Sequence, residues 1–128
     1  AKNAITVGVS TVNDLNTAAD TWNAQAGNLG ATSKYVTQIQ IARATGLITV
    51  TFNEANVGLA VGQNTLTLTP WMRDTAAGHA YAVALAAGAS GSVDWGCAST
   101  TNATATAQGV TPLGAGTVLA RFAPNQCR

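Results

Sequence analysis

The chain has 128 residues, a length typical of a single domain, and 47% of them are hydrophobic, so it can bury a core. Only 9% are charged, against about 25% in an average soluble domain, so Thr, Asn, Ser and Gln must supply the polar surface. The net charge of +1 and the scattered basic residues argue against a nucleic-acid-binding protein, which needs clustered Lys and Arg.

The sequence also bears on location. It has no run of about 20 apolar residues that could span a membrane, and no signal peptide at its start. It begins at Ala1 without Met, so we expect a processed or truncated product. The low charge and many hydroxyl side chains favour a secreted or surface protein over a cytosolic enzyme.

A helix is predicted over residues 1–27. Apolar residues recur there at spacings of three and four, forming one helix face: Ile5, Val9, Val12, Leu15, Ala19, Trp22 and Ala26. Gly27 and Gly30 supply stop signals. The alternative is a strand at 5–10, where β-branched residues alternate and Gly8 weakens a helix. We favour the helix because its spacing continues to Trp22.

Strands are predicted after a loop at 28–34. Segments 35–42 and 47–52 both alternate in hydrophobicity, and the short turn between them ends in Gly, which is typical of a hairpin. A third strand is predicted over 64–69. We expect its leucines, Leu66 and Leu68, to point inward and its threonines outward.

The next part of the sequence is more ambiguous. Pro70 is expected to end the third strand or to lie at its edge. The Ala-rich part of 71–91 fits either a small extra strand or a helical turn. Residues 93–97 predict a strand with Val93, Trp95 and Cys97 on one face, and 117–121 is a candidate for a last short strand.

The cysteines, Cys97 and Cys127, predict one disulfide formed in an oxidising compartment, with two buried free thiols as the alternative. Such a bond would tie the tail to the body of the domain and close an Ala-, Thr- and Gly-rich segment. In the loop-entropy model this stabilises the fold by roughly 3.5–4 kcal/mol. Metal binding is disfavoured, because the chain has one His and only Asp94 lies near a cysteine.

These elements predict an α+β domain: one N-terminal amphipathic helix packed on an antiparallel sheet of four or more strands, with a disulfide-closed C-terminal loop. The apolar stripe of the helix and the apolar face of the sheet would cover each other. We expect a single domain over 1–128.

We find no catalytic constellation in the sequence. His79 and Asp74 could form a hydrolytic triad with a serine, but no nucleophile motif accompanies them, and we expect His79 to be exposed to solvent. The acidic residues show no paired spacing for acid–base chemistry or calcium binding. Phosphate-binding glycine motifs are also missing.

Two surface features have alternative interpretations. Trp71 and Trp95 could present an aromatic surface to a sugar, but we expect Trp95, beside a cysteine in a strand, to pack in the core. Residues 102–104 fit a glycosylation sequon within a hydroxyl-rich stretch. The simpler interpretation of that stretch is a polar, exposed loop.

The C-terminal third carries a resemblance to a known family. A Val93-Asp-Trp-Gly-Cys97 strand, a Thr- and Ala-rich loop and an Ala123-Pro-Asn-Gln-Cys127-Arg128 end are similar to the disulfide loop of type IV pilins of the type IVa class. The order of the predicted elements also fits along nearly the whole chain. The chain departs from the family pattern at 71–91, which is longer than a simple connection, and at Ala123, where Leu often stands.

The resemblance implies a role for each segment. Residues 1–27 would be the C-terminal half of a long helix, 28–34 a loop, 35–97 the sheet and 97–127 the disulfide loop. The first half of that helix forms the filament core in this family, after a leader is removed and the new N-terminus methylated. The loop would hold residues for receptor contact: Thr100, Thr101, Asn102, Thr104, Pro124 and Asn125.

The resemblance also implies a function. The chain would be a structural subunit of a type IV pilus on a Gram-negative bacterium, made as an inner-membrane precursor and polymerised with identical copies. The filament would serve adhesion, twitching motility and DNA uptake, with phage able to exploit it. We expect this fragment to be monomeric, without enzymatic activity, cofactor or metal. The alternatives are a minor pilin or secretion pseudopilin acting as a tip or binding module and, remotely, a secreted enzyme.

Overall fold

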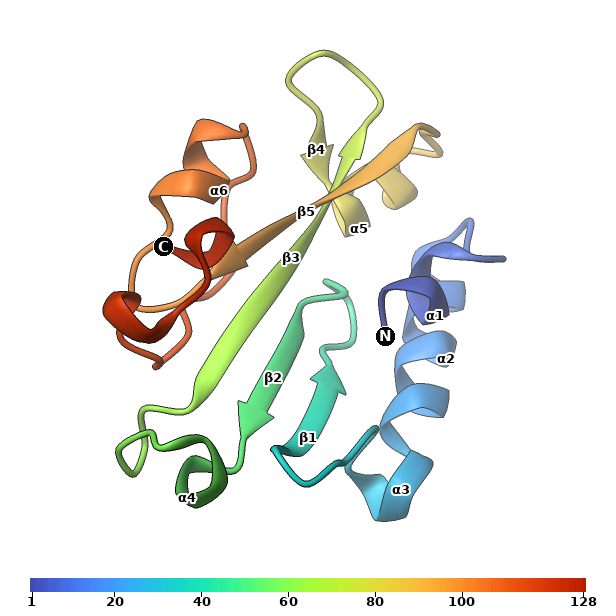
Figure 1. Cartoon of the computed structure of the whole chain (residues 1–128). Helices are drawn as coiled ribbons and strands as arrows, with labels where there is room; N and C mark the ends of the chain where they lie inside the picture. Colours follow the sequence, from blue (N-terminus) through green and yellow to red (C-terminus); the bar gives the residue numbers. More distant parts are fainter.

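The computed structural model describes all residues from Ala1 to Arg128 as an α+β domain built around one antiparallel sheet (Figure 1). Its strands are β1 (Val36–Ile41), β2 (Ile48–Phe52), β3 (Thr65–Arg73), β4 (His79–Ala80) and β5 (Ser92–Ala98). Its helices are α1 (Lys2–Thr6), α2 (Val12–Asn23), α3 (Gln25–Asn28), α4 (Glu54–Val57), α5 (Tyr81–Ala86) and α6 (Ala103–Ala107), with 3₁₀ turns η1 (Ala120–Phe122) and η2 (Asn125–Cys127). The predicted fold class is confirmed, and no helix is both long enough and apolar enough to cross a bilayer.

Strand β3 is the centre of the sheet, because three other strands pair with it. β2 pairs with its first half and β4 with its end, while β5 runs along most of its length. The predicted hairpin is present as β1 and β2, which pair in antiparallel register from Ile41–Ile48 to Gln38–Thr51, with a register shift before the Val36–Phe52 pair. Figure 1 shows the N-terminal helices on one side of the sheet and the C-terminal segment on the other side of the view.

The prediction that Pro70 ends the third strand or lies at its edge is wrong, because β3 continues through it to Arg73. Pro70 pairs with Trp95 of β5 and is buried. Thr65 directs its carbonyl away from β2, toward the N–H groups of Thr117 and Val118. The backbone groups of successive strand residues point to opposite sides of the strand. Those of Pro70 therefore point to the side where β2 and β4 lie, at a position that neither strand reaches. No ladder hydrogen bond is therefore lost there.

The N-terminal helix is confirmed, but it is not continuous over 1–27. α1 ends at Thr6 and α2 starts at Val12, with Gly8 between them at a φ of 74°. The Thr11 hydroxyl accepts a hydrogen bond from the Asp14 N–H at 3.1 Å, and the Asp14 carboxylate accepts two from Ser10. These bonds form an N-cap that starts a new helix. A Thr-x-x-Asp sequence was the signal for this break.

The predicted helix stripe is buried to different degrees. Ile5, Leu15 and Ala19 are fully buried, whereas Val9, Val12 and Trp22 are half-buried and Ala26 is exposed. The buried members belong to an apolar group that we call the helix-side cluster: Ile5, Leu15, Ala19, Ile41, Ile48, Met72, Tyr81, Ala84 and Leu85. Helix and sheet therefore cover each other as predicted.

The outer edge of β1 is closed by two side chains at the end of α2 and by the backbone of Leu29, which follows α3. The Trp22 Nε1–H donates to the Ile39 carbonyl at 2.9 Å, and the Leu29 carbonyl accepts from the Ile39 N–H at 3.1 Å. The Asn23 amide bonds both the N–H and the carbonyl of Ile41, each at 2.8 Å. All these edge groups therefore have partners within the chain.

Two further predictions needed correction or resolution. Thr67 and Thr69 are buried rather than outward-facing, because the Gly114 carbonyl and the Leu113 N–H bind their hydroxyls at 2.7 and 3.0 Å. Residues 117–121 form a bend and a 3₁₀ turn instead of a last strand. The ambiguous 71–91 segment contains the end of β3, the two-residue β4 and the helix α5.

Candidate functional site: the disulfide-closed C-terminal segment

The C-terminal segment starts where β5 ends and returns to it. Cys97, near the end of β5, is bonded to Cys127 in η2, thirty residues later. The segment thus carries the predicted disulfide and leaves no free cysteine. Around the bond lies a small apolar group that we call the tail-side cluster: Leu66, Cys97, Val118, Ala123 and Cys127.

Polar contacts fix both ends of the segment. The Ser99 hydroxyl and the Ser99 N–H both donate to the Cys127 carbonyl, at 2.6 and 2.9 Å. The Thr104 N–H donates to the Arg128 carbonyl, and its hydroxyl donates to the Asn125 carbonyl, each at 3.0 Å. The last residues of the chain are therefore held against α6 and the end of β5.

Helix α6 packs on β5 through Gly96. A Cβ at this position would lie 2.6 Å from a methyl of Val110 and 3.1 Å from the Ala105 methyl, so only glycine allows this approach. Ala105 and Val110 are buried by the contact. From there the chain returns along β3, where the Thr117 hydroxyl accepts hydrogen bonds from the Asn64 and Thr65 N–H groups at 3.0 Å.

The predicted receptor-contact residues fall into two groups. Thr100, Thr101, Pro124 and Asn125 are exposed, whereas Asn102 and Thr104 are half-buried. Thr104 and Asn125 are brought together by their hydrogen bond, while the Asn102 carboxamide accepts from the Thr106 hydroxyl at 3.2 Å. The exposed members offer hydroxyl and amide groups on a backbone that the disulfide restrains.

An apolar pocket of about 290 Å³ lies beside the segment. It is lined by residues of β2, of β3, of the connection between them and of the tail: Phe52, Val57, Gly58, Leu59, Leu66, Val118, Phe122 and Pro124. Phe122 is 57% exposed and stacks with Arg121, whose guanidinium carbon is 4.8 Å from the ring centroid. Prediction from sequence did not identify this pocket, because its residues come from stretches that lie far apart in the chain.

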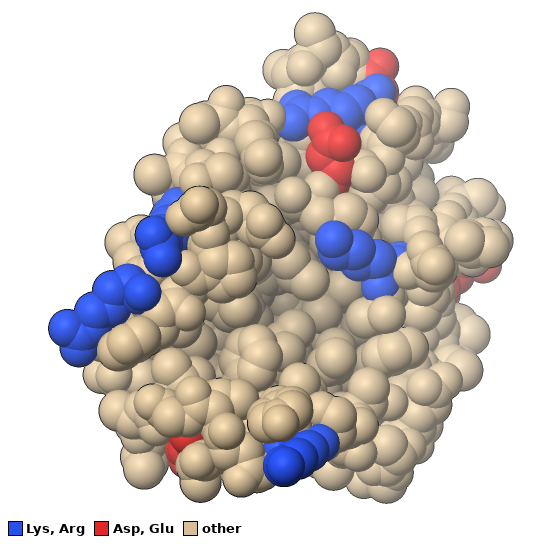
Figure 2. Space-filling model, in the orientation of Figure 1, with Lys and Arg blue, Asp and Glu red and all other residues tan.

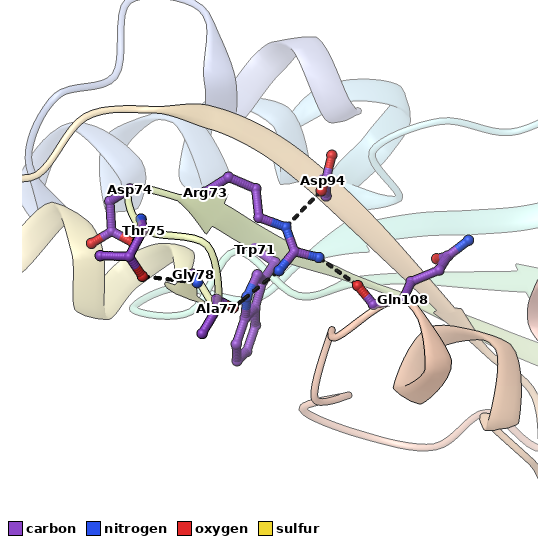
Figure 3. Close-up of polar contacts among 8 residues, drawn as sticks. All are labelled: Trp71, Arg73, Asp74, Thr75, Ala77, Gly78, Asp94 and Gln108. Atoms are coloured by element: carbon purple, nitrogen blue, oxygen red, sulfur yellow. Dashed lines mark hydrogen bonds and ion pairs between the residues drawn. The ribbon is translucent and has the colours of Figure 1, made fainter.

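Arg73 links three parts of the chain near the far end of β3 (Figure 3). Its guanidinium forms a 2.7 Å ion pair with Asp94 of β5 and donates to the Ala77 carbonyl at 3.0 Å and the Gln108 carbonyl at 2.6 Å. Trp71 also donates to the Ala77 carbonyl, at 3.0 Å. Arg73 was overlooked because the predicted third strand stopped at Pro70.

His79 and Asp74 are paired, with His79 Nδ1 2.9 Å from the carboxylate. This hydrogen bond is the main cause of the lowered pKa of Asp74. The His79 side chain is half exposed, as expected, and its ring bonds to Asp74 alone. Figure 2, drawn in the orientation of Figure 1, shows the basic side chains on that face of the molecule as separate groups with uncharged surface between them.

Comparison with known proteins agrees with this geometry. A family model described as pilin, a bacterial filament protein, matches residues 1–128. The crystal structure of a type IV pilin from Pseudomonas aeruginosa strain Pa110594 is 48% identical, with a TM-score of 0.92, over 99% of this chain and 86% of that one. No curated protein matched the sequence. The chain therefore belongs to the pilin family, whose members are structural subunits of bacterial filaments.

Proposed function

We propose that this domain is the displayed part of the major subunit of a type IV pilus on a Gram-negative bacterium. Identical copies would polymerise through helical residues N-terminal to this domain, after synthesis as an inner-membrane precursor. The filament would serve adhesion, twitching motility and DNA uptake. The observation that carries the proposal is the combination of the family match with an exposed, disulfide-restrained C-terminal segment.

The role of the segment in contact follows from its chemistry. Thr100, Thr101, Pro124 and Asn125 are exposed on a backbone tied to β5, so binding a receptor would require little ordering of the loop. A loop that is already ordered loses less conformational entropy on binding than a free one. We propose that these residues make the first contact of the filament with a surface.

The test separates assembly from contact. In a bacterium that carries the full-length gene, deletion should remove the dominant protein of sheared surface filaments and abolish twitching. A full-length protein present only at low copy number, with filaments persisting after deletion, would instead indicate a minor pilin or pseudopilin.

Contact is tested in strains with normal filament yield. Replacing Thr100, Thr101 and Asn125 together by Ala should reduce surface attachment while filament yield and twitching persist. The matched control replaces exposed Thr17, Thr32 and Asn13, which lie outside the segment. Equal attachment by both triple variants would contradict the proposed contact role.

A further inference from the structure

The outer edge of β5 is open, unlike that of β1. Thr65 turns its backbone groups toward Thr117 and Val118, so Thr67, Thr69, Trp71 and Arg73 turn theirs toward β5. Their partners on β5 are Ala98, Gly96, Asp94 and Ser92. The residues between these partners, Val93, Trp95 and Cys97, therefore point their N–H and carbonyl groups away from β3.

The open stretch is short and has a defined end. Beyond this stretch, the Ser99 N–H donates to the Cys127 carbonyl. Cys97 itself is bonded to Cys127 and is only 8% exposed. Val93 and Trp95 are half-buried, and no hydrogen bond outside the β ladder involves their backbone groups. Two N–H groups and two carbonyls thus form a template for one more strand.

Clefts flank this edge on both sides of the sheet. On the helix side, a cleft of about 290 Å³ is lined mainly by apolar side chains, among them Val9, Met72, Leu85 and Val93. On the opposite side, a polar cleft of about 400 Å³ is lined by Asp94, Trp95 and Gln108. An added strand would direct successive side chains alternately into the two clefts.

Charge assigns a side-chain type to each cleft. Arg73 Nε binds Asp94 Oδ2 at 2.7 Å, whereas Asp94 Oδ1 has no hydrogen-bond partner, and the side chain is 53% exposed (Figure 3). That oxygen can accept a hydrogen bond from a positively charged side chain. On the helix side, the Lys2 ammonium lies 5.5 Å from the Trp95 ring centroid, so a second positive charge is disfavoured there.

We propose that the outer edge of β5 binds an extended peptide segment of another protein, which joins the sheet as an additional strand. The segment carries a basic residue opposite Asp94, between two apolar residues opposite Val93 and Trp95. Strand addition of this kind takes its affinity from main-chain hydrogen bonds and its specificity from alternate side-chain pockets. A second copy of β5 fits poorly, because antiparallel self-pairing across this stretch brings two Asp94 carboxylates to one face.

This site shares Gln108 with the disulfide-closed segment but contains none of the proposed contact residues, so it does not depend on their role. The probe is the acetylated, amidated peptide Thr-Val-Lys-Val-Thr, added to the isotope-labelled domain and followed by amide NMR. We expect shifts centred on Val93 and Trp95, with at least about tenfold slower hydrogen exchange of these two amides. Shifts confined to the apolar pocket that Phe52 and Phe122 line would overturn the proposal, as would the absence of shifts at the highest soluble peptide concentration.

Two altered peptides test the recognition. Replacing the central Lys by Glu should weaken binding roughly fivefold, because attraction to one exposed carboxylate becomes repulsion. N-methylation of both valines should abolish binding, since it removes the main-chain donors that face β5. Equal binding by the methylated peptide would exclude strand addition.

The matched protein variants are Val93→Pro and Val93→Thr. Proline removes an outward-facing N–H without breaking a bond to β3, so we expect a folded domain that no longer binds the peptide. Threonine keeps that N–H and should bind as the wild-type protein does. If the proline variant does not fold, the exchange rates of Val93 and Trp95 in the wild-type domain, with and without peptide, decide the question.

Discussion

The two apolar clusters of the domain are held together in different ways. The helix-side cluster draws nine buried residues from helices and strands spread over most of the chain. The tail-side cluster has five, two of them the bonded cysteines. Burial of apolar area can maintain the first cluster, whereas the second depends on a covalent bond and a few hydrogen bonds. Removing one component from each cluster should therefore give different patterns of unfolding.

The largest effect is expected in the helix-side cluster. Leu15→Ala should lower the free energy of unfolding by roughly 3–5 kcal/mol, because Leu15 is fully buried and its removal leaves a cavity. Denaturant unfolding measures the loss, and the whole domain should unfold in one step. Val7→Ala, at a position 74% exposed, is the control and should change stability very little. Equal losses from both variants would contradict the assignment of the core.

Removal of the disulfide should lower the free energy of unfolding by a similar amount, but the loss of structure should be local. Replacing Cys97 and Cys127 together by Ala should cost roughly 3.5–4 kcal/mol in the loop-entropy model, since thirty residues separate them. Under native conditions, proteolysis should accelerate within 98–126 while amides of β1 and β2 remain protected. Unchanged cleavage of 98–126 would show that the segment holds its conformation without the bond.

Tyr81→Phe should have an intermediate effect. The Tyr81 hydroxyl donates to the Ile5 carbonyl at 2.7 Å and joins α5 to α1, so its loss should cost about 1–2 kcal/mol. Burial raises the pKa of Tyr81 above its ordinary value of 10.0. The unfolded chain therefore loses this proton first, and stability falls as pH rises above 10.0.

The alkaline step provides a second measurement on the same variant. The contribution of Tyr81 to the decline in stability above pH 10.0 should disappear in Tyr81→Phe and persist in Tyr35→Phe, because Tyr35 is 51% exposed. An alkaline decline of the same size in all three proteins would assign it to other groups.

The smallest effect is expected from Ser99→Ala in the tail-side cluster. The Ser99 hydroxyl is buried against the Cys127 carbonyl, but that carbonyl also accepts from the Ser99 N–H, so it keeps a partner. We expect a loss of about 1 kcal/mol by thermal or denaturant unfolding. A loss above that of Tyr81→Phe would mean that the hydroxyl orders more of the tail than its one bond suggests.

Several elements could be predicted because their signals are local. The alternation in 35–42, 47–52 and 93–97 corresponds to β1, β2 and β5, and the apolar stripe identified Ile5, Leu15 and Ala19 as buried. The disulfide followed from the cysteine count. These features depend on residue type and period, which are visible in one stretch of sequence.

The errors occurred where a distant segment decides the outcome. Thr67 and Thr69 look like solvent-facing residues until the 113–118 segment covers them. Pro70 looks like a strand end until the gap between β2 and β4 is known. The break at Gly8 was an exception, because the Thr11–Asp14 capping signal was local and was outweighed by the apolar spacing. The receptor-contact residues stay a prediction, since their role depends on a partner.

Pro70 also has a consequence for the hydrogen bonds of the central strand. Any other residue at this position would place a backbone N–H between β2 and β4, where neither strand supplies a carbonyl. A buried donor without a partner costs about 1–3 kcal/mol. Proline has no N–H, and its ring is buried beside Gly46, so β3 can continue from β2 to β4 without that loss.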